Sequence, residues 1–582
     1  MNARLSALLC GIGAALAAPY LIPVEPESFV MRAGVFSALL VLFAQLALVR
    51  VFEQHPLRHL CRTSVPAFIF ALALSVGTEL FTYGAFLPGL GSALRRLFVP
   101  LLITPFLSAF IYRLSALSLP DSGPGTRMEG LLCFCLLLLL WTPILLAYWP
   151  GMLNYDFQTE YMQHLTGEYS LIHPLTHSAL MISVISLGEH LVSRTFGLLL
   201  MSVFQMVVLA GVLTSACLFL RQHGISRPIV ACLCLFFGLH PVFSVMAVSM
   251  TKDTLFTACL IGLVIQGIDL LEHPETFFIR KSALVTFVLC ACGTALMRVN
   301  GLFALIPFFI ALLLRCHSRK VLLLTAASLL TPLMVHLGLL AALHPVSLPS
   351  FQLYSLPAQQ LVRAYNAGTL TETEKETLEG WYTSPDGLKV HPHLADPAKG
   401  YLDRDRLERE GSDFLSLWRS AAPHSAVPYL EAFLMLNIGS WYPDDLSHTT
   451  IYPDVSYNEK GYLQTQEYDM QEQGFHVTSY LPKVRSLYEQ FCRYNRYLRY
   501  PFLPLLFSTA IPIWILVLSL TVRRLRGTPV PFAPVAAPIA LFLSYLLGPC
   551  TLARYIMPLY ALAPVFLLLS YSSGPLPQAK AR

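Results

Sequence analysis

The stretch Tyr148–His177, YWPGMLNYDFQTEYMQHLTGEYSLIHPLTH, is a polar and aromatic segment between two apolar runs. It concentrates ionisable side chains in a chain whose overall charged fraction is only 13%. These side chains are Asp156, Glu160, His164, Glu168, His173 and His177. A polar loop between membrane-length runs can keep ionised groups in water without the cost of burying them in hydrocarbon. The pattern predicts an active-site loop.

The composition of the chain is that of a membrane protein. Of its 582 residues 55% are hydrophobic, and the mean hydropathy is +0.60, which lies outside the range of soluble globular proteins. The first apolar run, Leu5–Ile22, has no convincing signal-peptide cleavage site and is followed at once by further runs, so we expect a retained helix. The 13 cysteines lie mostly in or beside apolar runs, and no disulfide framework is expected. We predict an all-α polytopic membrane protein with membrane lipids, and no nucleic acid, as partners.

About 14 apolar runs approach the ~20 residues that a helix needs to cross the hydrocarbon core. They are 5–22, 30–50, 65–86, 94–112, 128–148, 196–220, 228–248, 254–271, 282–297, 302–315, 320–343, 501–522, 529–548 and 555–572. Residues 175–192 carry His177, Glu189 and His190, and we interpret them as a helix lying at the outer interface. A true span over 175–192 is the alternative.

The distribution of Lys and Arg sets the expected orientation. With 175–192 at the interface, the basic clusters at 221–227, 280–281, 315–320 and 523–526 fall on one side, which the positive-inside rule makes the cytoplasm. We therefore expect a cytoplasmic (inner) membrane protein with cytoplasmic N- and C-termini and the Asp156 loop outside. Arg95 and Arg96, at the outer end of their span, are an exception to this rule.

The chain divides into four expected parts. These are an N-terminal four-helix extension (1–127), a membrane core (128–343) with the outer loop 149–174, an extracytoplasmic α-rich domain (344–500) and a C-terminal three-helix segment (501–582). In the outer domain we expect helices over Thr371–Glu379, Asp413–Arg419 and Tyr429–Leu436. The run RYNRYLRY, Arg493–Tyr500, suits an interface with anionic head groups.

The predicted topology brings several polar and ionisable residues to the outer ends of spans. They are Asp156, Lys252, Asp253, Arg298, Asn300 and Arg554, with His173 in the outer loop. A charge near a helix centre costs ~2.5 to 3.5 kcal/mol on insertion scales and less near the interface, so such groups usually pair or bind a ligand. Carboxylates and cations at one surface suit a phosphate leaving group and a hydroxyl that must lose its proton.

We assign catalysis to Asp156, as a general base on a hydroxyl or as a group that positions the hydroxyl through a metal. The other six residues are predicted to bind substrate, with Lys252, Arg298 and Arg554 holding a phosphate. A divalent metal is left open as a cofactor. Glu160, one turn after Asp156, is expected at the surface or behind the site.

Each assignment has a simpler alternative. Asp156 could be a solvated loop acid or a helix cap, and His173 could cap the helix that follows it. Lys252–Asp253 could form a local ion pair at a helix start. Arg298 and Arg554 could extend to lipid head groups, as cations at span ends commonly do.

Several stretches resemble an uncharacterised bacterial membrane-protein family. PGMLNYDFQTEYMQHLTGEYSLIHPLTH resembles its first outer loop, SMTKDTLF (Ser249–Phe256) its Lys-Asp element, and RVNG (Arg298–Gly301) its Arg-Asn-Gly-like element. FLSLWRSAAPHSAVPYLEAFL followed by WYPDD resembles its outer domain, and ARYIMPLY its last span. The resemblance covers the chain from about residue 140 to its end, and the ordered set of motifs carries it.

That family resembles the GT-C glycosyltransferases, which take sugars from polyprenyl-phosphate donors and keep an acidic residue in the first large outer loop. The resemblance implies a GT-C-like fold and transfer of a sugar from a lipid-linked donor to a glycan, lipid or protein acceptor in the cell envelope. Two departures concern metal binding and donor identity: Leu175 replaces a second proline after His-Pro, and the loop has one Asp rather than a pair.

A transporter or flippase of lipid-linked glycans is the alternative from a different class. Transporters favour inverted repeats and broken helices at the membrane midplane, which the sequence does not reveal, and they seldom need so large an outer domain. An assembly scaffold is a third interpretation, with no positive support in the sequence.

Overall fold

The computed structural model describes residues 3–17, 57–120, 122–346, 353–444, 470, 472–493, 496 and 503–572. The expected span at 30–50 lies outside these residues, as does most of the Arg-Tyr run at 493–500. Within the described residues the regular structure is helical, and β pairing is limited to isolated bridges. The expected all-α class is confirmed. All 13 cysteines are free thiols.

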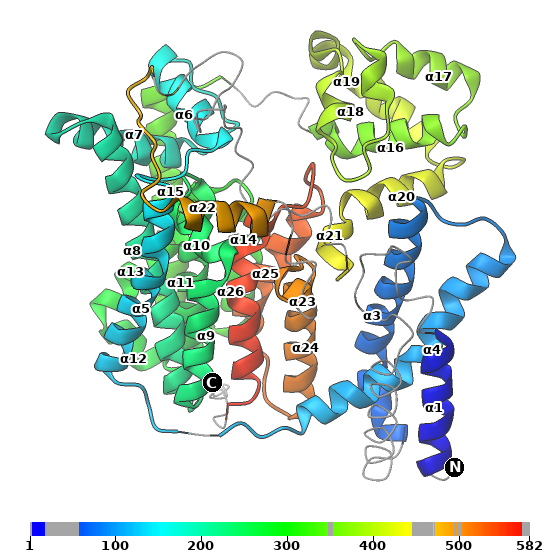
Figure 1. Ribbon diagram of the computed structural model, residues 1–582, viewed down its shortest axis with the longest axis horizontal. Coiled ribbons are helices and arrows are strands. Elements are labelled where there is room, and N and C mark those ends of the chain that lie inside the picture. The colour runs from blue at the N-terminus through cyan, green and yellow to red at the C-terminus, as the bar shows by residue number, and fades with distance from the viewer. Residues whose placement is uncertain are drawn as a thin grey trace.

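A bundle of apolar helices makes up the larger part of the molecule (Figure 1). Its members are α5 (Arg127–Ala147), α8 (Arg194–Gln222), α9 (Arg227–Leu239), α10 (Pro241–Val248), α11 (Lys252–Glu272), α13 (Lys281–Met297), α14 (Gly301–Arg315), α15 (Arg319–Leu343), α24 (Ile511–Leu525), α25 (Phe532–Tyr545) and α26 (Ala553–Leu569). The short α12 (Pro274–Ile279) and α23 (Leu503–Phe507) connect some of them, and α22 (Pro482–Tyr488), with the π-helical turn Glu489–Arg493, lies against α5.

Among the described residues, six helices are long and apolar enough to cross a membrane. They are Cys61–Tyr83, Leu90–Ser115, α5, α8, α11 and α15, and a seventh span results if α9 and α10 are counted together across a 50° bend. Several further apolar helices, including α13, α14, α25 and α26, are shorter. The helix over the expected interfacial segment, α7 (Leu175–Leu191), meets neither description. The described helices therefore fit the expected multi-pass membrane protein.

The connectors between the bundle helices gather at two opposite ends. At one end Arg221 and Arg227 both pair with Glu129, and Arg526 donates to backbone carbonyl groups that follow the fourth expected span. We call this the basic end, because it holds the basic clusters that the sequence predicts to share one side. The opposite end carries the loop 149–174 and is called the site end (Figure 1).

A separate helical layer lies at the same end of the molecule as the loop 149–174, above the N-terminal helices (Figure 1). It consists of α16 (Ser355–Asn366), α17 (Glu372–Glu379), the 3₁₀ turn η4 (Pro385–Leu388), α18 (Asp396–Gly400), α19 (Arg404–Ala421), α20 (Ala426–Leu436) and α21 (Ile438–Trp441). Its own hydrophobic core includes Leu361, Trp381 and Phe414. The expected helix at 371–379 is α17, which a capping box between Thr371 and Glu374 begins. The helix expected at 413–419 is longer, because it is the second half of α19.

The N-terminal helices α1 (Ala3–Ala17), α3 (Leu57–Tyr83) and α4 (Leu90–Ser115) pack on one another and contact the rest of the bundle through α24 (Figure 1). The Arg96 guanidinium donates to the Glu79 carboxylate at 3.0 Å and lies over the Phe86 ring. This ion pair neutralises Arg96, one of the two cations that depart from the positive-inside pattern.

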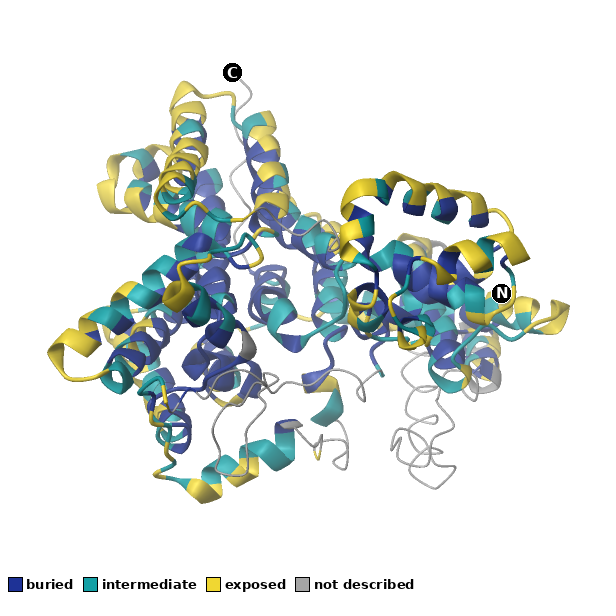
Figure 2. Cartoon of the chain, turned by 90° about the horizontal axis from the view of Figure 1, so that it is seen from above, coloured by how far each residue is buried: buried dark blue, intermediate teal, exposed yellow. Residues whose placement is uncertain are grey.

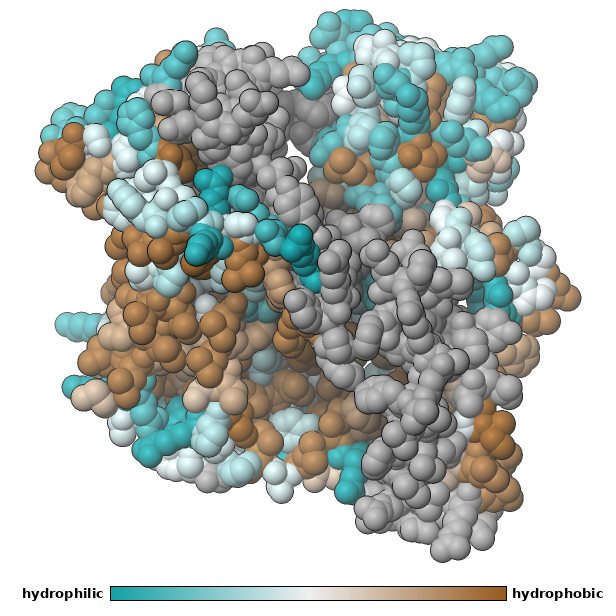
Figure 3. All heavy atoms as spheres, viewed as in Figure 1, coloured by the Kyte–Doolittle hydropathy of each residue, from teal (hydrophilic) through white to brown (hydrophobic). Residues whose placement is uncertain are grey.

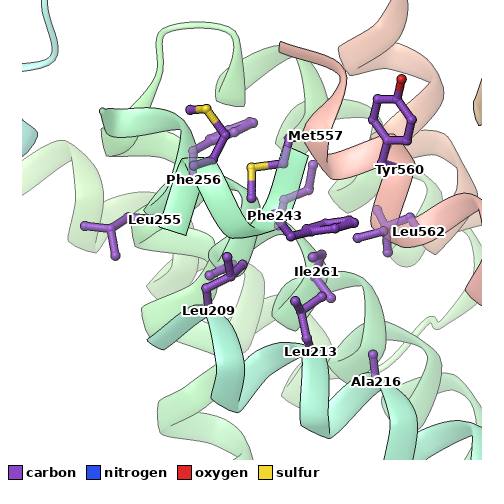
Figure 4. Close-up of a cluster of buried hydrophobic side chains, with 14 of the residues drawn as sticks. Leu209, Leu213, Ala216, Phe243, Leu255, Phe256, Ile261, Met557, Tyr560 and Leu562 are labelled. Atoms are coloured by element: carbon purple, nitrogen blue, oxygen red, sulfur yellow. The ribbon is translucent and has the colours of Figure 1, made fainter. Parts of the chain in front are cut away.

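Helix α11 is the centre of the bundle. Within its membrane-length window 72% of the residues are buried, against 11% for α15 at the periphery. Figure 2 shows the buried residues concentrated in the middle of the bundle and the exposed ones on the outward helices. Figure 4 shows side chains of α8, α10, α11 and α26 packed together there, among them Leu213, Phe243, Ile261 and Met557. A residue at either end of α11 is therefore held against several other helices.

The two-ended arrangement predicts the outcome of labelling with a membrane-impermeant thiol reagent in intact cells and in inverted vesicles. Cysteines placed at the exposed positions Glu168 and Thr373 should react from the same side, and a cysteine at Arg524 from the opposite side. The wild-type chain supplies the background labelling of its native thiols. Reaction of all three positions from one side would contradict the arrangement.

Candidate active site

Helix α6 (Tyr155–Thr166) fixes the position of Asp156. Its N-cap is Asn154, whose side-chain oxygen accepts a hydrogen bond from the Phe157 backbone N–H at 2.9 Å, and Gly167 ends the helix at φ 74°. Buried ring contacts, Phe157 and Tyr161 against Phe475, hold the helix on the bundle. Asn154 performs the capping role that was the alternative for Asp156, so the Asp156 carboxylate is free to face the site.

Asp156 lies between two cations from different helices. Its Oδ2 accepts from Lys252 Nζ and from Arg554 Nη1, each at 3.0 Å. Lys252 is the first residue of α11, which Thr251 caps, and Arg554 is in the first turn of α26. The three side chains are 12%, 13% and 20% exposed, so the cluster is largely desolvated but open on one side.

Asp253 forms a second ion pair behind the first. Its Oδ1 accepts from Arg298 Nη1, and its Oδ2 lies 3.8 Å from Arg554 Nη1. The local Lys252–Asp253 ion pair considered as an alternative does not form, because the two side chains point to different partners. Arg298 is 8% exposed, and its guanidinium lies 4.5 Å from the Tyr555 ring centroid, so it does not extend to head groups.

His173 contacts Lys252 from the loop side, and Glu160 and His177 lie behind His173. His173 Nδ1 lies 3.0 Å from Lys252 Nζ and 3.7 Å from Glu160 Oε1. Because an ammonium group can only donate, His173 Nδ1 is the acceptor, and the ring is the neutral tautomer with its proton on Nε2. Glu160 has no exposed surface and accepts from His177 Nδ1 and Ser178 Oγ at 2.7 Å each. Of the two positions expected for Glu160, the structure shows the one behind the site and not the one at the surface.

The charges of the cluster set the protonation states at the loop. Burial alone would raise the pKa of Asp156, but Lys252 and Arg554 outweigh it and hold that pKa well below its usual range. Glu160 behaves likewise, with burial outweighed by His177, so its pKa is also lowered. Burial, reinforced by Lys252, lowers the pKa of His173 to about 4. At neutral pH the cluster therefore contains ionised carboxylates beside a neutral His173.

Six of the seven predicted site residues come together at the site end, from α6, the following loop, α11, the turn after α13, and α26. The seventh, Asn300, donates to Ser544 Oγ at 3.0 Å and makes no side-chain bond to the other six in the described structure. Their roles in catalysis and substrate binding stay predictions. The geometry adds residues that the sequence reasoning did not select, chiefly Tyr545 and Tyr555, whose stacked rings flank Arg298. Tyr555 directly follows Arg554 in the ARYIMPLY stretch, and this adjacency was a usable signal.

Apolar side chains lie between the charged cluster and the middle of the bundle. Phe256 and Met557, about one turn below Asp253 and Arg554, belong to the hydrophobic cluster drawn in Figure 4. On this side Asp156 is separated from the middle of the bundle by apolar side chains.

Metal binding finds little support at this cluster. Among the described residues no group of three or more His, Cys, Asp and Glu side chains has the arrangement of a metal site. The Asp156 carboxylate also already pairs with two cations, which would repel a divalent ion. The residues here do not fit a metal centre.

The lowered pKa of His173 predicts a pH dependence of stability. In the unfolded chain His173 titrates near 6.5 and in the folded chain at about 4, so protons bind the unfolded state more readily and stability falls as pH drops through this interval. Between pH 6.5 and 4.5 the wild type should lose roughly 2 kcal/mol more than His173→Gln, at about 1.36 kcal/mol per pH unit. Denaturant titrations of both proteins in detergent at several pH values measure the difference, and equal slopes would contradict a buried, neutral His173.

Comparison with known proteins gives a single relationship. No curated protein and no solved structure matches the sequence. One family model, described as a family of unknown function (DUF6020), matches residues 165–579. The matched region contains His173, Lys252, Asp253, Arg298 and Arg554 and begins nine residues after Asp156. Because the match covers well over half of the chain, this protein belongs to the DUF6020 family of unknown function.

Proposed function

We propose that this protein is a GT-C-like membrane glycosyltransferase, which transfers a sugar from a polyprenyl-phosphate donor to an acceptor at the outer face of the cytoplasmic membrane. In this proposal the chain crosses the membrane about 14 times, with both termini in the cytoplasm. The site end is then extracytoplasmic, and the polyprenyl chain of the donor stays in the bilayer while its phosphate reaches the cluster.

One observation carries the proposal: a single carboxylate with two cations at 3.0 Å, set at the end of an apolar bundle and open on one side. Breaking a glycosyl phosphate bond needs positive charge at the departing phosphate, and making the new bond needs a base at the acceptor hydroxyl. Lys252 and Arg554 supply the charge, and Asp156 supplies the base. A solvated loop acid would not be desolvated between two cations from distant helices.

In the proposed reaction the acceptor oxygen attacks the anomeric carbon of the donor and its proton passes to Asp156. The bond between the anomeric carbon and the phosphate oxygen breaks, and its electron pair leaves with the phosphate. Lys252 Nζ and Arg554 Nη1 stabilise the charge that develops on the leaving oxygen. His173, as a neutral acceptor beside Lys252, holds the ammonium group in place.

In the resting state, the same two cations make Asp156 a weak base, because they keep its pKa low. A donor phosphate competes with the carboxylate for Lys252 and Arg554. As the two cations turn to the phosphate, the Asp156 pKa rises toward its ordinary value, and the base becomes active only when donor is bound.

The geometry favours Lys252 and Arg554 over Arg298 as phosphate ligands. Arg298 is committed to Asp253 and lies against Tyr555, and it is less exposed than either of the other cations. Its replacement would leave the buried Asp253 carboxylate with only the more distant Arg554 beside it among the described residues, and breaking a buried pair typically costs ~3 to 5 kcal/mol of stability. We therefore assign Arg298 to holding Asp253, which in turn lies beside Arg554.

A transporter or flippase of lipid-linked glycans is the second candidate, and the bend between α9 and α10 favours it, because broken helices often bind substrates in transporters. In this protein the break is filled by its own side chains. His240, at the bend, is buried, with Nε2 2.8 Å from the Leu506 carbonyl oxygen and Nδ1 accepting from the Val242 N–H. The polar groups of the break thus have partners, and this site offers little to a transported ion.

The deciding experiment incubates the purified protein with a panel of polyprenyl-phosphate sugars and candidate acceptors and follows donor consumption. The same protein in vesicles is tested for movement of a labelled lipid-linked glycan between leaflets. Donor consumption supports the transferase, and translocation without consumption supports the flippase.

The first functional prediction concerns Asp156. Asp156→Asn should reduce transfer by at least ~10²-fold, the lower range for loss of a general base. It should also bind donor at least as tightly as the wild type, because the competing carboxylate charge is gone. Asp269→Asn, which breaks the Asp269–Arg280 pair at the basic end, is the matched control and should retain transfer. An Asp156→Asn protein with wild-type turnover would make Asp156 structural.

The second concerns Arg554. Arg554→Gln should weaken donor binding by ~1.5 to 3 kcal/mol, the range for hydrogen bonds to charged groups. Arg554→Lys should restore only part of the affinity, because an ammonium group lacks the bidentate donors of Arg. Binding isotherms with the donor measure both, and unchanged affinity in Arg554→Gln would remove Arg554 from the phosphate site.

A further inference from the structure

A groove at the basic end has the shape and polarity of a lipid site, and it is far from Asp156. It lies between α5, α8 and α9, with a volume of about 230 Å³. Its walls are apolar and include Leu132 and Leu136 of α5, Leu218 of α8 and Val230 of α9. The face around it is uncovered and apolar, as Leu132 is 63% exposed and Leu239, later on α9, is 59% exposed. Figure 3 shows apolar side chains over the helices on the left of the molecule, with hydrophilic ones gathered below them.

The groove opens beside a polar hollow of about 370 Å³. Arg221 and Arg227 line both spaces, and Ser122 and Ser226 line the hollow only. An apolar channel that continues into a polar pocket through two guanidinium groups matches the division of a phospholipid into acyl chains and head group.

The charges at the junction favour a singly negative head group. Arg221 is buried and donates to Glu129, Ser122 and two backbone carbonyl groups, so its donors are largely used. Arg227 is 69% exposed and donates only through Nε to Glu129, which leaves its two terminal amino groups without partners in the described structure. One carboxylate and two guanidinium groups leave a net charge of +1, which complements a phosphodiester.

We infer that this groove is a binding site for an acidic phospholipid of the leaflet at the basic end, with acyl chain along Leu132, Leu136 and Val230 and phosphodiester at Arg227. A water-soluble partner could not reach walls that lie within the apolar band of the bundle. On the proposed topology this leaflet is the cytoplasmic one, where acidic lipids attract basic side chains.

The test is lipid binding to the purified full-length protein, measured by native mass spectrometry with phosphatidylglycerol and phosphatidylcholine of equal chain length. The wild type should bind phosphatidylglycerol about fivefold more tightly, the equivalent of ~1 kcal/mol for one basic side chain near the membrane surface. Arg227→Gln should lose this preference. The Glu129–Arg221 pair remains in that variant, so the fold is kept, and its melting temperature checks this point.

Two matched controls make the test specific. Arg280→Gln removes another half-exposed arginine at the basic end and should keep the preference. Ala231→Trp, on the groove wall, should reduce binding of both lipids, whereas Cys232→Trp, at an exposed neighbouring position that does not line the groove, should not.

Three outcomes would overturn the inference. They are equal affinity of the wild type for the two lipids, equal effects of Arg227→Gln and Arg280→Gln, and a mass that shows a second copy of the chain in place of lipid. The first two would mean that lipids only solvate this face, and the third would make it a subunit interface.

Discussion

The desolvated contact of one carboxylate with two cations is the constraint on which the site end depends. Asp156 belongs to α6, Lys252 to α11 and Arg554 to α26, so this contact joins a loop helix, the central helix and the last helix of the bundle. A buried ion pair gains little net stability when it is complete, but removing one partner leaves a charge that the neighbouring apolar side chains cannot solvate. The relative positions of these helices are therefore coupled to the electrostatic balance of the site.

The second ion pair extends this balance inward. Arg298 and Asp253 neutralise one another beside the stacked Tyr545 and Tyr555 rings. The second carboxylate oxygen of Asp253 lies 3.8 Å from Arg554 Nη1. Charges thus alternate through the cluster from Lys252 to Arg298. An anion that enters at the open side meets cations that carboxylates already orient, which lowers the reorganisation needed on binding.

The sequence predicted the convergence of the site better than its internal pairing. Charged residues at the span ends of an apolar chain are few and costly, so five of them, Asp156, Lys252, Asp253, Arg298 and Arg554, could be assigned to one surface from their positions in the chain alone. Pairing depends on side-chain direction, and nothing in a single sequence states that Lys252 turns to Asp156 while its neighbour Asp253 turns to Arg298. The sequence left two positions open for Glu160, the surface and a place behind the site, for a related reason, since its partners His177 and Ser178 lie on the next helix.

The helices, too, were predicted well where a run is uniformly apolar and less well where a helix bends within such a run. Long uniform runs such as α5 and α8 were predicted from length and hydropathy, whereas the bend at His240 was not, because both halves of the expected span 228–248 are apolar. By contrast, the end of α13 at Met297 and the start of α14 at Gly301 agree with the expected spans 282–297 and 302–315 to within one residue, because the turn between them carries the polar residues Arg298 and Asn300. Polar residues at helix ends, rather than mean hydropathy, decide such breaks.

The separation of the site residues along the chain has a consequence for biosynthesis. Asp156 and Arg554 are 398 residues apart, and Arg554 belongs to the last described helix. While the ribosome is still making the outer layer, Asp156 has Lys252 as its only basic neighbour and Asp253 has Arg298. Insertion of α26 completes the charge set, so a chain that stops short of it has a pocket that lacks Arg554, the cation that contacts both Asp156 and Asp253.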